Sequence, residues 1–160
     1  MKYPGVSVVL PILNEERYLK EAVEAILEQQ YPGDFEIILA LGPSIDRTHE
    51  IAQKLHEVNP RVVLVESPTG RTPAGLNLAI KKAKFDIICR IDGHAQVSKT
   101  YIRDAVDIME ETGAVNVGGI MAAEGESPFE RAVATAMRSP LGVGGARFHI
   151  GGKAGPADTV

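Results

Sequence analysis

The chain has 160 residues, of which 44% are apolar and 24% charged, and its net charge is −4. This length suits one domain, and the average composition excludes a disordered or fibrous protein. The negative charge argues against a nucleic-acid binder with a broad basic surface. The lone Cys89 excludes a disulfide framework and indicates a reducing compartment.

The sequence has no apolar run near the roughly 18 residues that a membrane-spanning helix needs. Its first residues also lack the charged and apolar regions of a signal peptide. We therefore expect a cytoplasmic location, with peripheral contact to the inner face of a membrane only through segments of a longer parent protein.

Short apolar runs alternate with helical patterns along the chain. The apolar runs predict strands at residues 6–10, 35–41, 62–65, 85–91 and 115–121. Helices are predicted over residues 15–30, from Asp46 or Thr48 through Leu55, from Thr72 past Ile80, from Ser98 past Met109, and from Ser127 to near Arg138. This alternation predicts a Rossmann-like α/β fold, in which a mostly parallel sheet is flanked by helices on both faces.

All five predicted helices have a candidate N-cap, which is Asp46 or Thr48 in the second helix and Ser98 in the fourth. Asn14 is a candidate N-cap for the first helix, and Thr72 followed by Pro73 has the form of an N-cap with proline at the first helical position. Ser127 and Glu130 have the spacing of a capping box.

Ligands of parallel sheets bind beyond the carboxyl ends of the strands. The segments to inspect are therefore those that follow the predicted strands, at residues 11–16, 41–46, 66–72 and 92–96. Polar or charged side chains occur in each of them, so a binding site is expected at this edge of the sheet.

Asp92, Gly93 and His94 directly follow the fourth predicted strand. A carboxylate and an imidazole two residues apart can converge on one divalent ion, and an oxygen ligand with open positions suits Mn²⁺ or Mg²⁺ on a diphosphate. The glycine between them lets the backbone approach a ligand closely. The alternative is that Asp92 caps a turn and His94 is a surface residue.

Two further segments have both a binding and a structural interpretation. A helix that starts after residues 11–16 would offer free backbone N–H groups to a nucleotide or phosphate; alternatively, Asn14, Glu15 and Glu16 are ordinary cap and first-turn residues. Arg71 could contact a base or a diphosphate, or it could be a solvated surface charge.

Several strings, taken in order, resemble the family 2 glycosyltransferases of GT-A fold. They are Val8-Val9-Leu10-Pro11 with Asn14-Glu15-Glu16, Ser44-x-Asp46-x-Thr48, Gly70 to Asn77 with Ala83, and Arg90 to Ala95, where the family has its Asp-x-Asp metal motif. Within the family the likeness is to the ExoA type of succinoglycan biosynthesis, whose motif ends in His. Val117-Gly118-Gly119, Ser139 to Gly144 and Ala157 to Val160 also resemble that type.

The resemblance implies an inverting transferase that moves a sugar from a nucleotide-diphosphate donor, usually UDP-linked. The acceptor would be a saccharide or a lipid-linked saccharide in surface or exopolysaccharide synthesis. Pro11, Leu13 and Glu15 would line the nucleoside pocket, while Asp92 and His94 would hold the metal. The implied donor-binding residues are Pro11, Leu13, Asn14, Glu15, Gly42, Gly70, Arg71, Asn77, Arg90, Asp92 and Gly93.

Two departures from the family pattern affect the prediction. Leu41 and Gly42 stand where the family has an Asp pair, one of which contacts uracil, so the base of the donor is left open. The family's general base lies downstream of the metal motif, and we expect it beyond Val160, with Asp158 as the alternative candidate. The chain therefore resembles a catalyst truncated before its base.

The predicted organisation is a nucleotide-sugar-binding core at residues 1–138, followed by a glycine-rich start of the acceptor region at 139–160 that could be disordered. A nucleotide-sugar-binding fragment without turnover is an alternative to the transferase, because the base is missing. A nucleotidyltransferase is a third interpretation, but that class favours a loop rich in glycine and basic residues after the first strand, and residues 11–16 are acidic.

Overall fold

The computed structural model describes residues 3–121, 123–125, 127–143 and 155. The chain divides into two compact units, Met1–Arg103 and Asp104–Val160. The domain boundary expected between residues 138 and 139 remains a prediction, because most of the glycine-rich segment after it lies outside the described residues.

A parallel sheet of four strands forms the centre of the first unit. The strands are β1 (Val6–Ile12), β2 (Phe35–Leu41), β3 (Val62–Glu66) and β4 (Ile87–Arg90), in the spatial order β3-β2-β1-β4. Six of the seven residues in each of the two central strands are buried, as expected when helices cover both faces of a parallel sheet. The predicted α/β fold is confirmed, although β4 is shorter than predicted.

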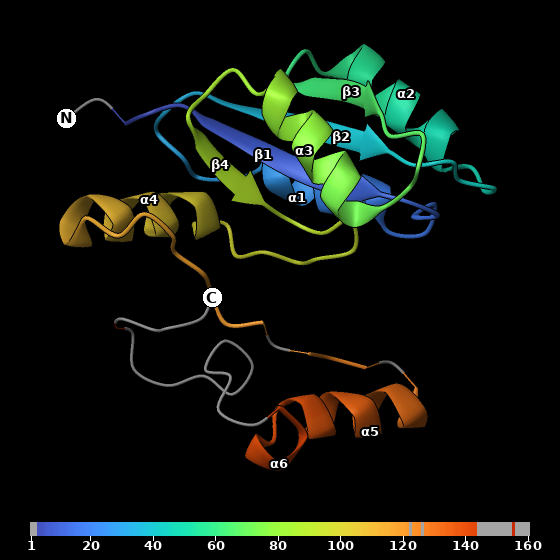
Figure 1. The fold of residues 1–160 in the computed structure, drawn as a ribbon, viewed down its shortest axis with the longest axis vertical. Helices are drawn as coiled ribbons and strands as arrows, with labels where there is room; N and C mark the ends of the chain where they lie inside the picture. The colour runs from blue at the N-terminus through green and yellow to red at the C-terminus, as the bar shows by residue number, and fades with distance from the viewer. Residues whose placement is uncertain (1–2, 122, 126, 144–154, 156–160) are drawn as a thin grey trace. The chain divides into compact units, whose positions relative to one another are not determined.

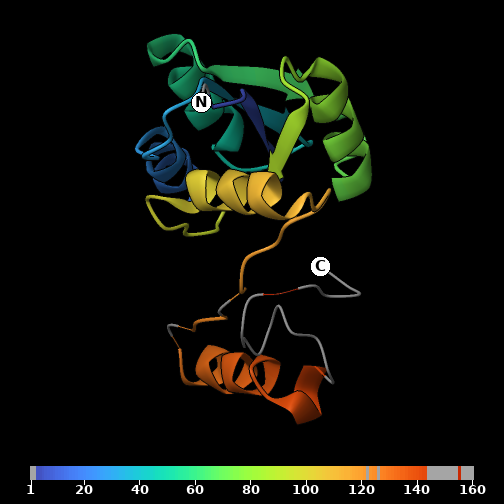
Figure 2. The same ribbon diagram turned by 90° about the vertical axis from the view of Figure 1, so that its left-hand side faces the viewer.

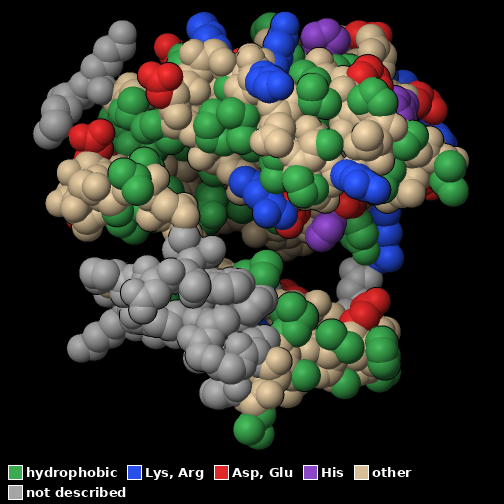
Figure 3. All heavy atoms as spheres, viewed as in Figure 1, with side chains coloured by type: hydrophobic (Ala, Val, Ile, Leu, Met, Phe, Trp, Pro, Cys, Tyr) green, Lys and Arg blue, Asp and Glu red, His purple; other side chains and the backbone are tan. Residues whose placement is uncertain are grey.

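Helices cover both faces of this sheet. Helices α1 (Leu19–Leu27) and α2 (Thr48–Val58) lie on one face, and α3 (Thr72–Lys82) lies on the other (Figures 1 and 2). Ala79 of α3 is fully buried in a core cluster with Val9 and Ile38 of the central strands. On the face shown in Figure 3, basic and acidic side chains are interspersed with apolar ones.

The strand order fixes where a ligand can bind. From β1 the chain proceeds outward to β2 and β3 and then returns to place β4 on the other side of β1. Because crossover connections are right-handed, this reversal moves α3 to the opposite face of the sheet. The carboxyl ends of β1 and β4 therefore flank a topological switch point, where open α/β sheets bind their ligands.

Several predicted helix starts differ from the structure: Arg47 rather than Asp46 or Thr48 occupies the N-cap position of α2, and the helix expected from Ser98 begins at Tyr101. Helix α1 begins at Leu19 rather than residue 15, and Tyr18 rather than Asn14 occupies its N-cap position. Asn14 instead has a positive φ of 55° and lies in a bend after β1. Helix α3 begins with Thr72 itself, so the predicted cap is wrong by one residue and Arg71 occupies the cap position.

The second unit contains the end of α4 (Tyr101–Thr112), α5 (Pro128–Met137) and α6 (Pro140–Val143). The capping box is confirmed, because Ser127 Oγ accepts from the Glu130 N–H at 3.2 Å and Glu130 Oε2 accepts from the Ser127 N–H at 2.9 Å.

The fifth strand predicted at residues 115–121 is wrong. The described sheet contains only β1 to β4, and residues 115–121 pair with none of them. Val115 is 95% exposed and Ile120 is 61% exposed, so the apolar run is not part of a buried ladder. An apolar run forms a strand only where a neighbouring strand satisfies its backbone hydrogen bonds. Among the described residues no strand pairs with this run.

Candidate functional site

The loops after β1 and β4 meet at the switch point of the sheet. Glu15 follows β1 and His94 follows β4, and His94 Nδ1 lies 2.8 Å from Glu15 Oε1. The Glu15 side chain is only 15% exposed, whereas that of His94 is 61% exposed. A largely buried carboxylate therefore holds an imidazole that faces solvent.

Asp92 is held in place by the last residue of β4. Its Oδ1 accepts from Arg90 Nε at 3.1 Å and from Arg90 Nη2 at 3.0 Å. Both of these hydrogen bonds fall on one carboxylate oxygen. Asp92 is thus oriented by a guanidinium, and Arg90, which the family resemblance placed among the donor-binding residues, contacts Asp92 directly.

Gly93 is packed closely against two side chains of the loop after β1 and its strand end. A Cβ added there would lie 2.7 Å from Ile12 Cδ1 and 3.2 Å from Glu15 Cγ. Such contacts are shorter than van der Waals packing permits, so glycine lets the loop after β4 lie directly on the loop after β1. This close approach is what brings His94 within hydrogen-bond distance of Glu15.

The side chains of Asp92 and His94 at this edge of the sheet are suited to a divalent ion that also binds a ligand. A metal-binding histidine commonly donates its second ring N–H to a carboxylate, which fixes the tautomer and the ring orientation. The Glu15 contact engages His94 Nδ1, and Nε2 is then the ring nitrogen that can bind metal, alongside a carboxylate oxygen of Asp92. Among the described residues no group of three or more His, Cys, Asp or Glu side chains is arranged to hold a metal, so a diphosphate and water would supply the other ligands.

The backbone N–H groups after β1 are not available to a phosphate. The N–H of Asn14 donates to Ser44 Oγ at 2.9 Å, that of Glu15 to Thr48 Oγ1 at 2.8 Å, and that of Glu16 to Asp46 Oδ2 at 3.1 Å. The expectation that this segment offers free N–H groups is therefore wrong. These residues are also not the first turn of a helix, because α1 begins four residues after Glu15.

Asp46 makes hydrogen bonds in the loop after β1 and in the loop after β2. It accepts the Thr48 N–H through Oδ1 at 3.0 Å at the start of α2, and its Oδ2 accepts from Glu16. Hydrogen bonding with Thr48 holds the pKa of the Asp46 carboxyl below its usual value. Asp46 therefore stays ionised and joins the loop after β1 to the loop after β2.

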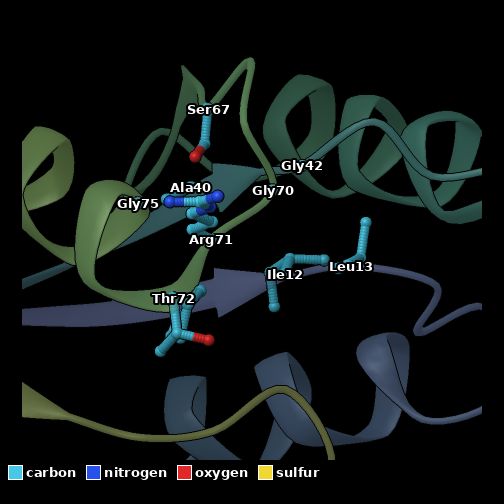
Figure 4. Close-up of a pocket in the computed structure, with 10 residues that line it drawn as sticks. Ile12, Leu13, Ala40, Gly42, Ser67, Gly70, Arg71, Thr72 and Gly75 are labelled. Carbon is cyan, nitrogen blue, oxygen red and sulfur yellow. The ribbon is translucent and has the colours of Figure 1, made fainter.

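A cavity opens on the other side of the β1 end, beside the start of α3 (Figure 4). Its volume is about 70 Å³, smaller than the roughly 300–1,000 Å³ of typical small-molecule sites. The lining residues are Pro11, Ile12, Leu13, Ala40, Gly42, Ser67, Gly70, Arg71, Thr72 and Gly75. It thus joins the carboxyl ends of β1 and β2 to the N-terminus of α3.

Five of the predicted donor-binding residues line this cavity: Pro11, Leu13, Gly42, Gly70 and Arg71. Others lie elsewhere. Glu15, expected in the nucleoside pocket, contacts His94. Asn14 Oδ1 accepts from the Ile45 N–H at 2.9 Å, and Asn77 is an exposed residue of α3.

Gly42 lies in a crowded position, where a side chain would require its neighbours to shift by a few tenths of an ångström. A Cβ at this position would lie 3.0 Å from Gly70 Cα, 3.1 Å from the Ile12 carbonyl oxygen and 3.1 Å from Leu13 Cδ1. Gly70 itself has a φ of 61°, in the left-handed region that favours glycine. The two glycines close the wall of the cavity with backbone atoms.

Five lining residues were not among the predicted donor-binding residues: Ile12, Ala40, Ser67, Thr72 and Gly75. Ser67 is the first residue after β3, so its place at a strand end was a usable signal. Gly75 is a buried glycine inside a helix, and an isolated glycine in a helical pattern indicates a close packing contact. Asp158, the alternative candidate for the general base, lies outside the described residues.

A sequence model described as Glycosyl transferase family 2 matches residues 7–154. The chain belongs to this family. The succinoglycan biosynthesis protein ExoA of Rhizobium meliloti (strain 1021) is 33% identical to it over 146 residues, which are 90% of this chain and 44% of that protein. The resemblance to the ExoA type is thereby confirmed, and the chain spans less than half the length of this relative.

Solved glycosyltransferase structures share the fold. A mannosyltransferase of Pyrobaculum calidifontis, in complex with GDP-Man and Mn²⁺, is 25% identical, with a TM-score of 0.64 over 86% of this chain and 40% of that one. TarS of S. aureus, residues 1–349 in complex with UDP, is 22% identical, with a TM-score of 0.61 over 79% of this chain and 40% of that one. These likenesses confirm the GT-A fold.

No helix in the part of the chain that the structure describes has both the length and the apolar character needed to cross a membrane.

Proposed function

We propose that this chain is the donor-binding part of a metal-dependent, inverting glycosyltransferase whose donor is a nucleotide-diphosphate sugar. UDP is the nucleotide we expect, and the acceptor is a saccharide or a lipid-linked saccharide in surface or exopolysaccharide synthesis. The ExoA relative supports the exopolysaccharide role, and the UDP complex of TarS supports the choice of nucleotide.

One observation supports this proposal most strongly: the cavity and the Asp92–His94 loop adjoin on the two sides of Ile12. Ile12 lines the cavity, and its Cδ1 also packs against Gly93. A nucleoside in the cavity would therefore place its diphosphate near the carboxylate and the imidazole. This order of base pocket and metal ligands is the one that a nucleotide-diphosphate sugar requires.

The proposed chemistry is an in-line displacement at the anomeric carbon of the sugar. A divalent ion would neutralise the charge that develops on the departing diphosphate. The protein's own task is to orient the two ligands: Arg90 fixes Asp92, and Glu15 fixes His94. Arg71, exposed at the start of α3, lies at the cavity where it can contact the base or the diphosphate.

The test is a calorimetric titration of UDP, GDP and CDP into the chain, with and without Mn²⁺. We expect one nucleotide to bind in a metal-dependent manner, and its identity names the base. Asp92→Ala should abolish the metal-dependent part of binding, whereas the control Asp86→Ala, an exposed carboxylate just before β4, should not. Equal Mn²⁺-dependent affinity in the wild type and in Asp92→Ala would rule out the metal assignment.

A further inference from the structure

The side chain of Ser67 is buried without a hydrogen-bond partner. Ser67 is 2% exposed, and its Oγ makes no hydrogen bond with the described residues. Its backbone is fixed on both sides, because its N–H donates to the Leu41 carbonyl at 2.8 Å and its carbonyl accepts the Gly70 N–H at 3.0 Å. The backbone that carries this hydroxyl is therefore held in the turn after β3.

A buried hydroxyl without a partner reduces the stability of a fold, and most buried polar groups are satisfied. Ser7 of the same sheet shows the usual arrangement. It is fully buried, its Oγ donates to Glu36 Oε1 at 2.7 Å and it accepts the Phe85 N–H at 3.1 Å. The contrast indicates that the partner of Ser67 is supplied by something other than the folded chain.

The hydroxyl faces the cavity. Ser67 lines it, and in Figure 4 its oxygen points from the loop after β3 toward Ala40 and Gly75. A Cβ added at Gly75 would lie 3.3 Å from Ser67 Oγ and 3.4 Å from Ala40 Cβ. The absence of a side chain at Gly75 therefore leaves the space beside the hydroxyl open.

The walls of the cavity restrict what can fill this space. Ile12, Leu13 and Ala40 present apolar surface, and Gly42 and Gly70 present backbone. The other polar lining side chains, Arg71 and Thr72, are exposed. An apolar slot with one buried hydroxyl fits a flat ring that has a polar edge, and a hydroxyl can both donate to a ring carbonyl and accept from a ring N–H.

We propose that the Ser67 hydroxyl hydrogen-bonds to the polar edge of the donor nucleobase and determines base specificity in this cavity. This inference rests on the proposed function, since it requires a nucleotide donor. It assigns the recognition of the base to a neutral group after β3, at a site where Gly42 carries no side chain and the space for one is tight.

The experiment compares Ser67→Ala with Ser7→Ala in calorimetric titrations of UDP, GDP, CDP and inorganic pyrophosphate with Mg²⁺, together with thermal unfolding without ligand. We expect Ser67→Ala to weaken binding of the preferred nucleotide about 2- to 12-fold and to leave pyrophosphate affinity unchanged. Its Tm should equal or exceed that of the wild type, because the variant removes an unsatisfied group. Ser7→Ala should lower the Tm and leave nucleotide affinity unchanged.

Three outcomes would overturn the inference alone: unchanged nucleotide affinity in Ser67→Ala, an equal loss of pyrophosphate affinity, or a fall in Tm as large as that of Ser7→Ala. The first would show that the hydroxyl does not contact the ligand. The second would place the contact on phosphate, and the third would show an internal partner. A wild-type chain that binds none of the nucleotides would overturn the proposed function together with the inference.

Discussion

Glu15 Oε1 lies 2.8 Å from His94 Nδ1, although 79 positions separate the two residues in the chain. The contact exists because β1 and β4 are parallel neighbours whose carboxyl ends share one edge of the sheet. It gives Glu15 a role other than lining a nucleoside pocket: the carboxylate orients the candidate metal ligand.

Glu15→Ala should weaken Mn²⁺-dependent nucleotide binding by about 10- to 100-fold, the range typical for loss of a residue that orients a metal ligand. The cause is that His94 loses the carboxylate that holds its ring. Calorimetry with and without Mn²⁺ measures the effect, and metal-free affinity should stay constant. Glu21→Ala, an exposed glutamate in the first turn of α1, is the control. A Glu15→Ala protein with wild-type metal dependence would contradict this role.

Gly93→Ala should reduce both stability and Mn²⁺-dependent affinity. The new methyl group would lie 2.7 Å from Ile12 Cδ1 and 3.2 Å from Glu15 Cγ, and overpacking of this kind costs about 1–3 kcal/mol. Urea unfolding and titration of the preferred nucleotide measure the two effects.

The matched control for this variant is Gly113→Ala. Gly113 has a φ of 69°, but a Cβ there would meet nothing within 4 Å. It should lose about 1 kcal/mol of stability from backbone strain and keep its nucleotide affinity. Equal affinity in Gly93→Ala and the wild type would show that the loop after β4 can move away without effect on the site.

Asn14→Ala should destabilise the chain by about 1–2 kcal/mol, and Asn14→Gly should cost less. Asn14 has a φ of 55°, which alanine tolerates poorly and glycine tolerates well. Both variants lose the hydrogen bond from the Ile45 N–H to Asn14 Oδ1, so the difference between them isolates the backbone strain. Chemical denaturation of the three proteins provides the comparison, and a less stable Asn14→Gly would contradict the strain argument.

The stability of the chain should fall with rising pH between about pH 9 and 11 through Cys89. Burial disfavours the thiolate and raises the pKa of Cys89 from 9.0 to about 11. The unfolded chain therefore ionises first, so stability contributed by the neutral thiol is complete below pH 9 and is lost as pH rises to 11. Urea unfolding of the wild type and Cys89→Ala should give parallel pH profiles below pH 9 and a steeper decline for the wild type above it. Parallel profiles throughout would contradict the raised pKa.

The sequence predicted the architecture of the sheet because burial on both faces leaves a local signal. The apolar runs at residues 6–10, 35–41, 62–65 and 85–91 correspond to the four strands. The run at 115–121 gave the same signal and forms no strand in the described structure. The apolar run itself does not show whether it will form a strand, because a strand also needs a neighbouring strand to pair with. Local composition does not reveal whether such a neighbour is present.

The sequence also predicted which loops would lie at one edge of the sheet, because parallel strands place their carboxyl ends together. The family resemblance added the Asp92–His94 motif and Arg71, whose binding roles remain predictions. Only the tertiary structure decided the contacts between loops. It placed Glu15 against His94, used the N–H groups of residues 14–16 within the fold and buried the Ser67 hydroxyl in a cavity. Such contacts join residues distant in the chain, and they depend on strand order and close glycine packing, which leave no periodic pattern in the sequence.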